Sequence, residues 1–163
     1  YWCKGVMNIQ QRPDTSEYGS VDPAPPSDTE QLNELKDILL DEKQKMFQRM
    51  RSVFKLRNMR SSESCMILCE AFASRSALLR HELAYVLGQM QMDDAVPTLI
   101  SILSDSSEHV MVRHEAAEAL GAIGNPDAIP VLKEFLHDEH IEVSESCEVA
   151  LDLLNWVSNS TIA

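Results

Sequence analysis

The sequences RHELAYVLGQMQMDDAVPTLISIL at residues 80–103 and RHEAAEALGAIGNPDAIPVLKEFL at residues 113–136 are two copies of one segment, displaced by 33 residues. The copies are identical at 11 of 24 positions. A period of this length, with room for two helices and a tight turn, is typical of an α-solenoid, in which each helix pair buries its apolar face against its neighbours. The repeat therefore predicts an all-α chain of stacked helix pairs.

Apolar residues at spacings of three and four predict further helices on both sides of the two copies. The first stripe contains Leu32, Leu35 and Leu39, and the others cover residues 45–59, 63–73, 77–91, 95–104, 109–123, 127–137 and 142–157. Weaker copies of the repeat lie at residues 49–59 and 143–154. We expect an α-solenoid of stacked helix-pair repeats.

Residues that favour helix ends lie between these apolar stripes. Gly124 is placed to close one helix, Asn125 to cap the next, and Pro126 to occupy a first-turn position. Gly88 and Gly121 lie seven residues after the two repeated histidines, and we expect them to allow close helix packing.

Three parts are expected along the chain. Residues 1–28 contain four prolines and no sustained apolar period, which predicts a disordered extension. Residues 29–157 form the repeat domain, and residues 158–163 begin a linker or tail. Because the chain begins with Tyr1 and stops soon after a helical pattern, we expect a fragment of a longer protein.

The composition limits the partners. A formal net charge of -12 and a pI near 4.7 argue against nucleic acid and anionic membranes, and favour a basic partner. No apolar run approaches the ~20 residues of a membrane span, and the first residues do not resemble a secretion signal. Cys65, Cys69 and Cys147 are expected to pack as reduced thiols. These features indicate a soluble, cytoplasmic protein.

The residues that recur without an obvious packing role are His81 with Glu82 and His114 with Glu115. Equivalent helices of stacked repeats lie roughly 8–10 Å apart, so the two imidazoles can converge on one point. Imidazole binds Fe, Zn, Cu or Ni, and two histidines with one carboxylate form the ligand set of non-haem iron oxygenases. All four residues are therefore candidate metal ligands.

Helix geometry complicates a single site. Adjacent helical residues point about 100° apart, so the carboxylate of each pair is expected to serve a different ion or an outer coordination shell. Further ligands would then be needed, and a second, similar set of pairs would complete a dinuclear centre. Alternatively, the pairs are merely polar groups on the inner surface. Arg80 and Arg113 are expected to pair with nearby carboxylates such as Glu82, Glu115 or Glu118.

Other chemistries find no support. The H-E-x-x-H motif of zinc proteases is interrupted by Tyr85 in one copy and Glu118 in the other. Neither a Gly-x-Ser-x-Gly nucleophile elbow nor a Gly-rich phosphate loop occurs. Two alternatives of another kind stay open: a metal-free HEAT scaffold that binds partners on its concave face, and a protein similar to bilin lyases.

The strings SALLRHELAYVLGQMQ (residues 76–91), VRHEAAEALGAIGNPDAIPVL (112–132) and IEVSESCEVALDLLNW (141–156) closely resemble deoxyhypusine hydroxylase. The resemblance covers roughly residues 45–157. It implies a HEAT-repeat enzyme with two similar halves, in which four His-Glu pairs hold two iron ions. His81, Glu82, His114 and Glu115 would correspond to the pairs of the first half, so this chain alone would be incomplete.

The same resemblance implies the reaction and its partners. Enzymes of this family are monooxygenases that use molecular oxygen to hydroxylate deoxyhypusine on a translation initiation factor, completing hypusine. The expected cofactor is therefore iron, and the expected partner is that factor, whose basic modified side chain suits an acidic protein.

Overall fold

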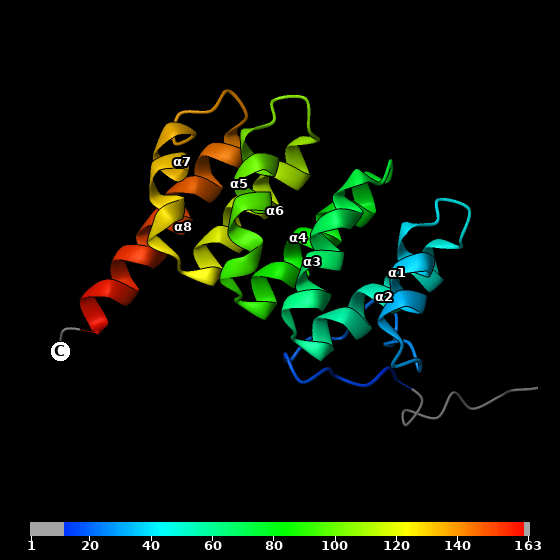
Figure 1. The fold of residues 1–163 in the computed structure, drawn as a ribbon. Coiled ribbons are helices and arrows are strands. Elements are labelled where there is room, and N and C mark those ends of the chain that lie inside the picture. The colour runs from blue at the N-terminus through cyan, green and yellow to red at the C-terminus, as the bar shows by residue number, and fades with distance from the viewer. Residues whose placement is uncertain (1–11, 162–163) are drawn as a thin grey trace, which may run out of the picture.

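The computed structural model describes residues 12–161, and the helices in this range form four consecutive pairs (Figure 1). The α-helices are α1 (Leu32–Leu40), α2 (Met46–Met59), α3 (Ser62–Glu70), α4 (Ala77–Met90), α5 (Val96–Ser104), α6 (Val110–Ile123), α7 (Ile129–Glu134) and α8 (Ile141–Ser160). Short 3-10 turns lie at Ala71–Ala73, Asp93–Ala95 and Pro126–Ala128. The described residues include no strand, and the predicted all-α solenoid is confirmed.

Local side chains explain where the helices begin and end. Ser61 and Ser64 form a capping box at the start of α3, each satisfying a backbone amide of the other. Gly124 ends α6 with a φ of +79°, and the Asn125 side chain accepts from the amide of Asp127, both as predicted. The first three pairs each join a helix of 9 residues to one of 14, whereas the last pair joins a helix of 6 residues to one of 20.

The second helices of the pairs, α2, α4, α6 and α8, lie side by side in one layer (Figure 1). A Cβ added at Gly88 would come within 3.0 Å of the Cα of Ala119, and one at Gly121 within 2.9 Å of the Cα of Ala150. These two glycines therefore let α6 approach α4 and let α8 approach α6, which agrees with the predicted packing role. The close approach brings the site residues of neighbouring repeats together.

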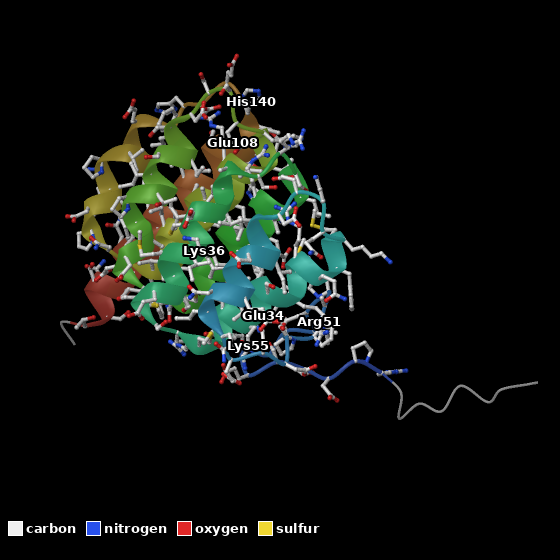
Figure 2. The ribbon with its side chains drawn as sticks, turned by 45° about the vertical axis from the view of Figure 1, so that its right-hand side comes forward. Glu34, Lys36, Arg51, Lys55, Glu108 and His140 are labelled. Carbon is white, nitrogen blue, oxygen red and sulfur yellow. The ribbon has the colours of Figure 1, made fainter. Side chains whose placement is uncertain are left out.

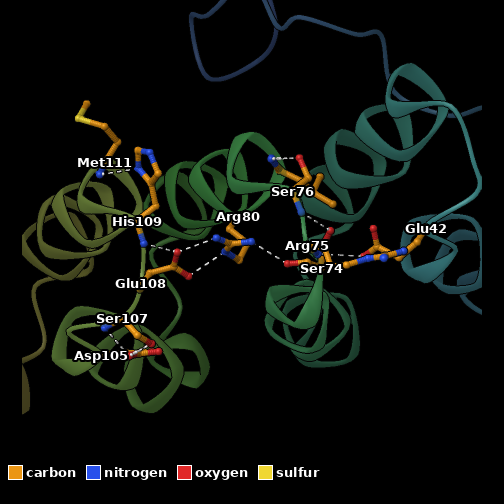
Figure 3. Close-up of polar contacts among 11 residues, drawn as sticks. Glu42, Ser74, Arg75, Ser76, Arg80, Asp105, Ser107, Glu108, His109 and Met111 are labelled. Atoms are coloured by element: carbon orange, nitrogen blue, oxygen red, sulfur yellow. Dashed lines mark hydrogen bonds and ion pairs between the residues drawn. The ribbon is translucent and has the colours of Figure 1, made fainter.

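Two arginines at equivalent positions connect neighbouring repeats along one edge of this layer. Arg80 donates to the carbonyl of Ser74 at 2.8 Å and makes two 2.8 Å bonds to Glu108 in the next repeat (Figure 3). Arg113 repeats the pattern with the Leu103 carbonyl at 2.9 Å and with Asp138 at 2.7 Å. The expected partners Glu82, Glu115 and Glu118 are therefore wrong, because the arginines extend to the loops between helices. These three carboxylates therefore receive no ion pair from Arg80 or Arg113.

Residues 12–28 pack against the repeats, contrary to the predicted disorder. Arg57 of α2 is fully buried, and its guanidinium donates to both carboxylate oxygens of Asp22 at 3.0 and 2.6 Å. The same guanidinium lies 4.6 Å above the Tyr18 ring, and Ala24 is buried. The segment passes Arg51 and Lys55 (Figure 2). A buried cation needs a partner, and here a segment poor in apolar residues provides it. Residues 1–11 of the expected extension lie outside the described residues.

Three further expectations concern the far end of the chain, the cysteines and the membrane. Helix α8 continues to Ser160, so residues 158–160, expected in a linker or tail, belong to the last helix. Cys65, Cys69 and Cys147 are buried free thiols, as predicted. None of the helices in residues 12–161 combines the length and apolar composition that a membrane span requires.

Candidate metal centre

His81 and His114 occupy equivalent places on α4 and α6, and their side chains face one another. The ring centroids are 6.5 Å apart, and the planes are inclined by 29°. Both side chains are partly exposed, at 33% and 20%. The two imidazoles therefore converge at an accessible point, as the repeat spacing predicts.

Glu115 completes a group of three. One of its carboxylate oxygens lies 3.1 Å from Nε2 of His81 and 3.5 Å from Nε2 of His114. One ligand atom from each residue can be chosen so that all lie within 4.8 Å of one another. The 100° step along α6 turns Glu115 toward α4, so its carboxylate lies beside both histidines and is not directed elsewhere.

Glu82 takes no part in this group, although it is equivalent to Glu115. The same step along α4 turns Glu82 toward α2, where Met50 stands in place of a histidine. Burial raises the pKa of Glu82; among the neighbouring charges, His81 lowers it, Asp22 raises it and Arg57 lowers it. The carboxylate of Glu82 is therefore influenced by charges from α4, from α2 and from the packed N-terminal segment.

Hydrogen bonds fix the tautomer of His114. The Ser146 hydroxyl donates to the Glu142 carbonyl at 2.7 Å, so its oxygen is free to accept the proton of His114 Nδ1 at 2.6 Å. A neutral His114 then carries a lone pair on Nε2, the atom nearest Glu115. Sequence reasoning missed this role, although Ser146 stands at the place of the repeated glutamate in the last copy.

The electrostatic state of Glu115 is unfavourable without a bound cation. Burial raises the pKa of this carboxyl to about 7, the charge of Glu118 raises it as well, His114 opposes the shift, and Glu82 adds to it. Glu118 also lies 3.6 Å from Nδ1 of His114. A divalent cation between the three ligand atoms would neutralise this concentration of negative charge.

Comparison with known proteins identifies the family of the repeats. Residues 65–152 match the family model for HEAT repeats. The chain belongs to the HEAT-repeat family. Within the described residues, this match covers the helices that carry His81, His114 and Glu115, so the candidate site lies in the repeats themselves.

Several relatives of this HEAT-repeat chain are named deoxyhypusine hydroxylase. The chain is 47% identical to the Bos taurus protein, over 88% of this chain and 48% of that one. It is 43% identical to the Saccharomyces cerevisiae protein, over 99% and 50% of the two chains. The structure of human deoxyhypusine hydroxylase in complex with glycerol matches with a TM-score of 0.85 and 46% identity, over 88% of this chain and 50% of that chain. The resemblance is thus confirmed, and the chain spans about half the length of these relatives.

Proposed function

We propose that this chain forms one half of a deoxyhypusine hydroxylase, an iron-dependent monooxygenase that hydroxylates deoxyhypusine on a translation initiation factor. The group of His81, His114 and Glu115 carries the proposal, because its ligand types are those of oxygen-activating non-haem iron sites. The similarity to relatives named for this reaction supports it. A cytoplasmic location belongs to the same proposal.

The residues fit an iron ion. His81 and His114 would bind through Nε2, and Glu115 through a carboxylate oxygen. Ser146 would orient the His114 ring, an arrangement that strengthens metal binding in many proteins. Bound iron would provide the redox chemistry that activates molecular oxygen. Glu82, which is not a member of the three-residue group, is proposed as a ligand of a second iron or as a contact for the substrate.

The charge of the site suits the proposed substrate. Deoxyhypusine carries two amino groups on an aliphatic chain, and both are protonated near neutral pH. Glu118 is about half exposed at the site, and the whole chain has a net charge of -12. Such a surface attracts a cationic side chain over distances of about the Debye length.

The test measures the iron bound by purified chains and their hydroxylation activity. We expect Fe(II) to bind the wild type, and His81→Ala and His114→Ala to lose it with their helical content unchanged. His137→Ala is the matched control, because His137 is exposed and is absent from the three-residue group. With a complementary half supplied by a relative, a deoxyhypusine peptide should gain one oxygen atom. Wild-type chain without iron, and no hydroxylated product, would favour the metal-free scaffold.

A further inference from the structure

The N-terminal segment is connected to the face of α4 that carries His81. Arg57 pairs with Asp22, and Arg57 also donates to the side-chain oxygen of Gln89 at 2.9 Å. Gln89 in turn lies 3.3 Å from the Tyr85 hydroxyl. His81, Tyr85 and Gln89 follow one another at spacings of four, so they lie on one face of the helix. Hydrogen bonds through Gln89 thus connect the buried ion pair of Arg57 and Asp22 to the Tyr85 phenol, one helical turn from His81.

The direction of each hydrogen bond in this network is determined by chemistry. A guanidinium only donates, so the oxygen of the Gln89 amide must face Arg57 and its NH2 group must face Tyr85. The Tyr85 oxygen therefore accepts this bond, and its own proton remains available to another acceptor. Tyr85 is 38% exposed, so that acceptor can come from outside the chain.

The position equivalent to Tyr85 in the next repeat already contacts the site. Glu118 lies four residues after His114, as Tyr85 lies four after His81, and its carboxylate is 3.6 Å from the His114 ring. The two side chains therefore flank the histidine pair on the same side. One presents a carboxylate, and the other presents a hydroxyl proton.

We propose that Tyr85 donates a hydrogen bond to a main-chain carbonyl of the protein substrate bound at the histidine pair. Gln89 and Arg57 are the positioning residues that turn the phenol proton outward. The inference rests on the proposed function, because the amino groups of deoxyhypusine are donors when protonated and the acceptors that a peptide adds are its carbonyls. Asp22 acts on the phenol only through this network, because it holds the guanidinium of Arg57 in place.

The test is the affinity of the purified chain for a fluorescent peptide carrying deoxyhypusine. Tyr85→Phe should weaken binding about fivefold, the effect of one ordinary hydrogen bond. Gln89→Glu should cause a similar loss, because a carboxylate accepts from both Arg57 and Tyr85 and turns the phenol proton inward. The double variant, with Tyr85→Phe and Gln89→Glu together, should bind the peptide no more weakly than either single variant. Tyr18→Phe is the matched control, since the Tyr18 hydroxyl is buried without a hydrogen-bond partner.

Gln89→Glu separates positioning from a merely structural role. The added carboxylate keeps the contact with Arg57 and attracts a cationic peptide, so a structural role predicts equal or tighter binding. Unchanged affinity in Tyr85→Phe, with the wild type binding the peptide, would overturn the inference and leave the proposed function standing. A wild type that binds iron without binding the peptide would overturn both the inference and the proposed substrate.

Discussion

The carboxylate of Glu115 lies between two imidazoles from successive repeats, with few polar groups to offset its charge. The candidate site thus depends on side chains whose ionisation changes when a cation binds. The sequence predicted the types of these residues and the convergence of the histidines. It did not predict that Glu115 would join them and Glu82 would not, because that difference depends on which neighbouring helix each carboxylate faces.

Protonation of Glu115 should affect the stability of the metal-free chain. The pKa is about 7 in the folded chain and 4.5 as the ordinary value. Between these values the folded state binds more protons than the unfolded state, so the free energy of unfolding should fall as pH rises. We expect Glu115→Gln to remove this dependence and to be more stable than wild type at about pH 8, by up to ~3 kcal/mol.

Urea unfolding with a chelator, at about pH 5 and about pH 8, measures this effect. Glu148→Gln on the exposed face of α8 is the control, and it should keep the pH dependence of the wild type. If Glu115→Gln were no more stable than wild type at the higher pH, the folded chain would not disfavour the charged form of the Glu115 carboxyl.

Ser146 should influence iron binding without contacting iron. Ser146→Ala removes the acceptor for Nδ1 of His114, and loss of such a partner typically lowers metal affinity by about tenfold or more. Competition with a chromogenic Fe(II) chelator gives the affinity. Ser158→Ala is a close control, because Ser158 also bonds the carbonyl four residues earlier in α8. Equal affinities for the two variants would contradict the assigned tautomer.

At the scale of elements, the helices could be predicted because their determinants are local. Apolar periodicity, Gly124 and Asn125 all act within a few residues, and the structure agrees with each. The arginine contacts could not be predicted in the same way. Arg80 reaches Glu108, 28 residues away in the next repeat, and nearer carboxylates were available in the sequence.

The approach of α6 and α8 makes a prediction at this scale. Gly121→Ala would place a methyl group 2.9 Å from the Cα of Ala150. In an open helix this change would stabilise by about 1 kcal/mol. Here we expect a loss of about 2 kcal/mol in unfolding free energy, because the helices must separate to admit the methyl group. Thermal unfolding checks this, with Glu148→Ala as an exposed helical control. A raised melting temperature for Gly121→Ala would show that the helices are not tightly packed.

Across the whole molecule, residues 12–28 join the first repeat to the face of α4 that carries His81. Sequence composition predicted disorder there, since prolines and polar residues cannot form a core of their own. The segment is instead fixed by Asp22 on a buried guanidinium 35 residues away. Such a contact leaves no periodic signal in the sequence.

Removing that partner should destabilise the whole chain. Asp22→Ala leaves Arg57 buried without its carboxylate, and breaking a buried ion pair on one side costs about 3 kcal/mol or more. Urea unfolding at neutral pH measures the loss. Asp14→Ala removes an equal charge from an exposed place in the same segment and should have little effect. Similar stabilities for the two variants would mean that the segment is not docked.

The most direct test of the central claim is a crystal structure of the chain grown anaerobically with Fe(II), with anomalous diffraction data at the iron edge. We predict an iron peak between Nε2 of His81, Nε2 of His114 and the carboxylate of Glu115. An iron peak elsewhere, or none at this group in crystals whose iron concentration saturates the protein in solution, would contradict the account.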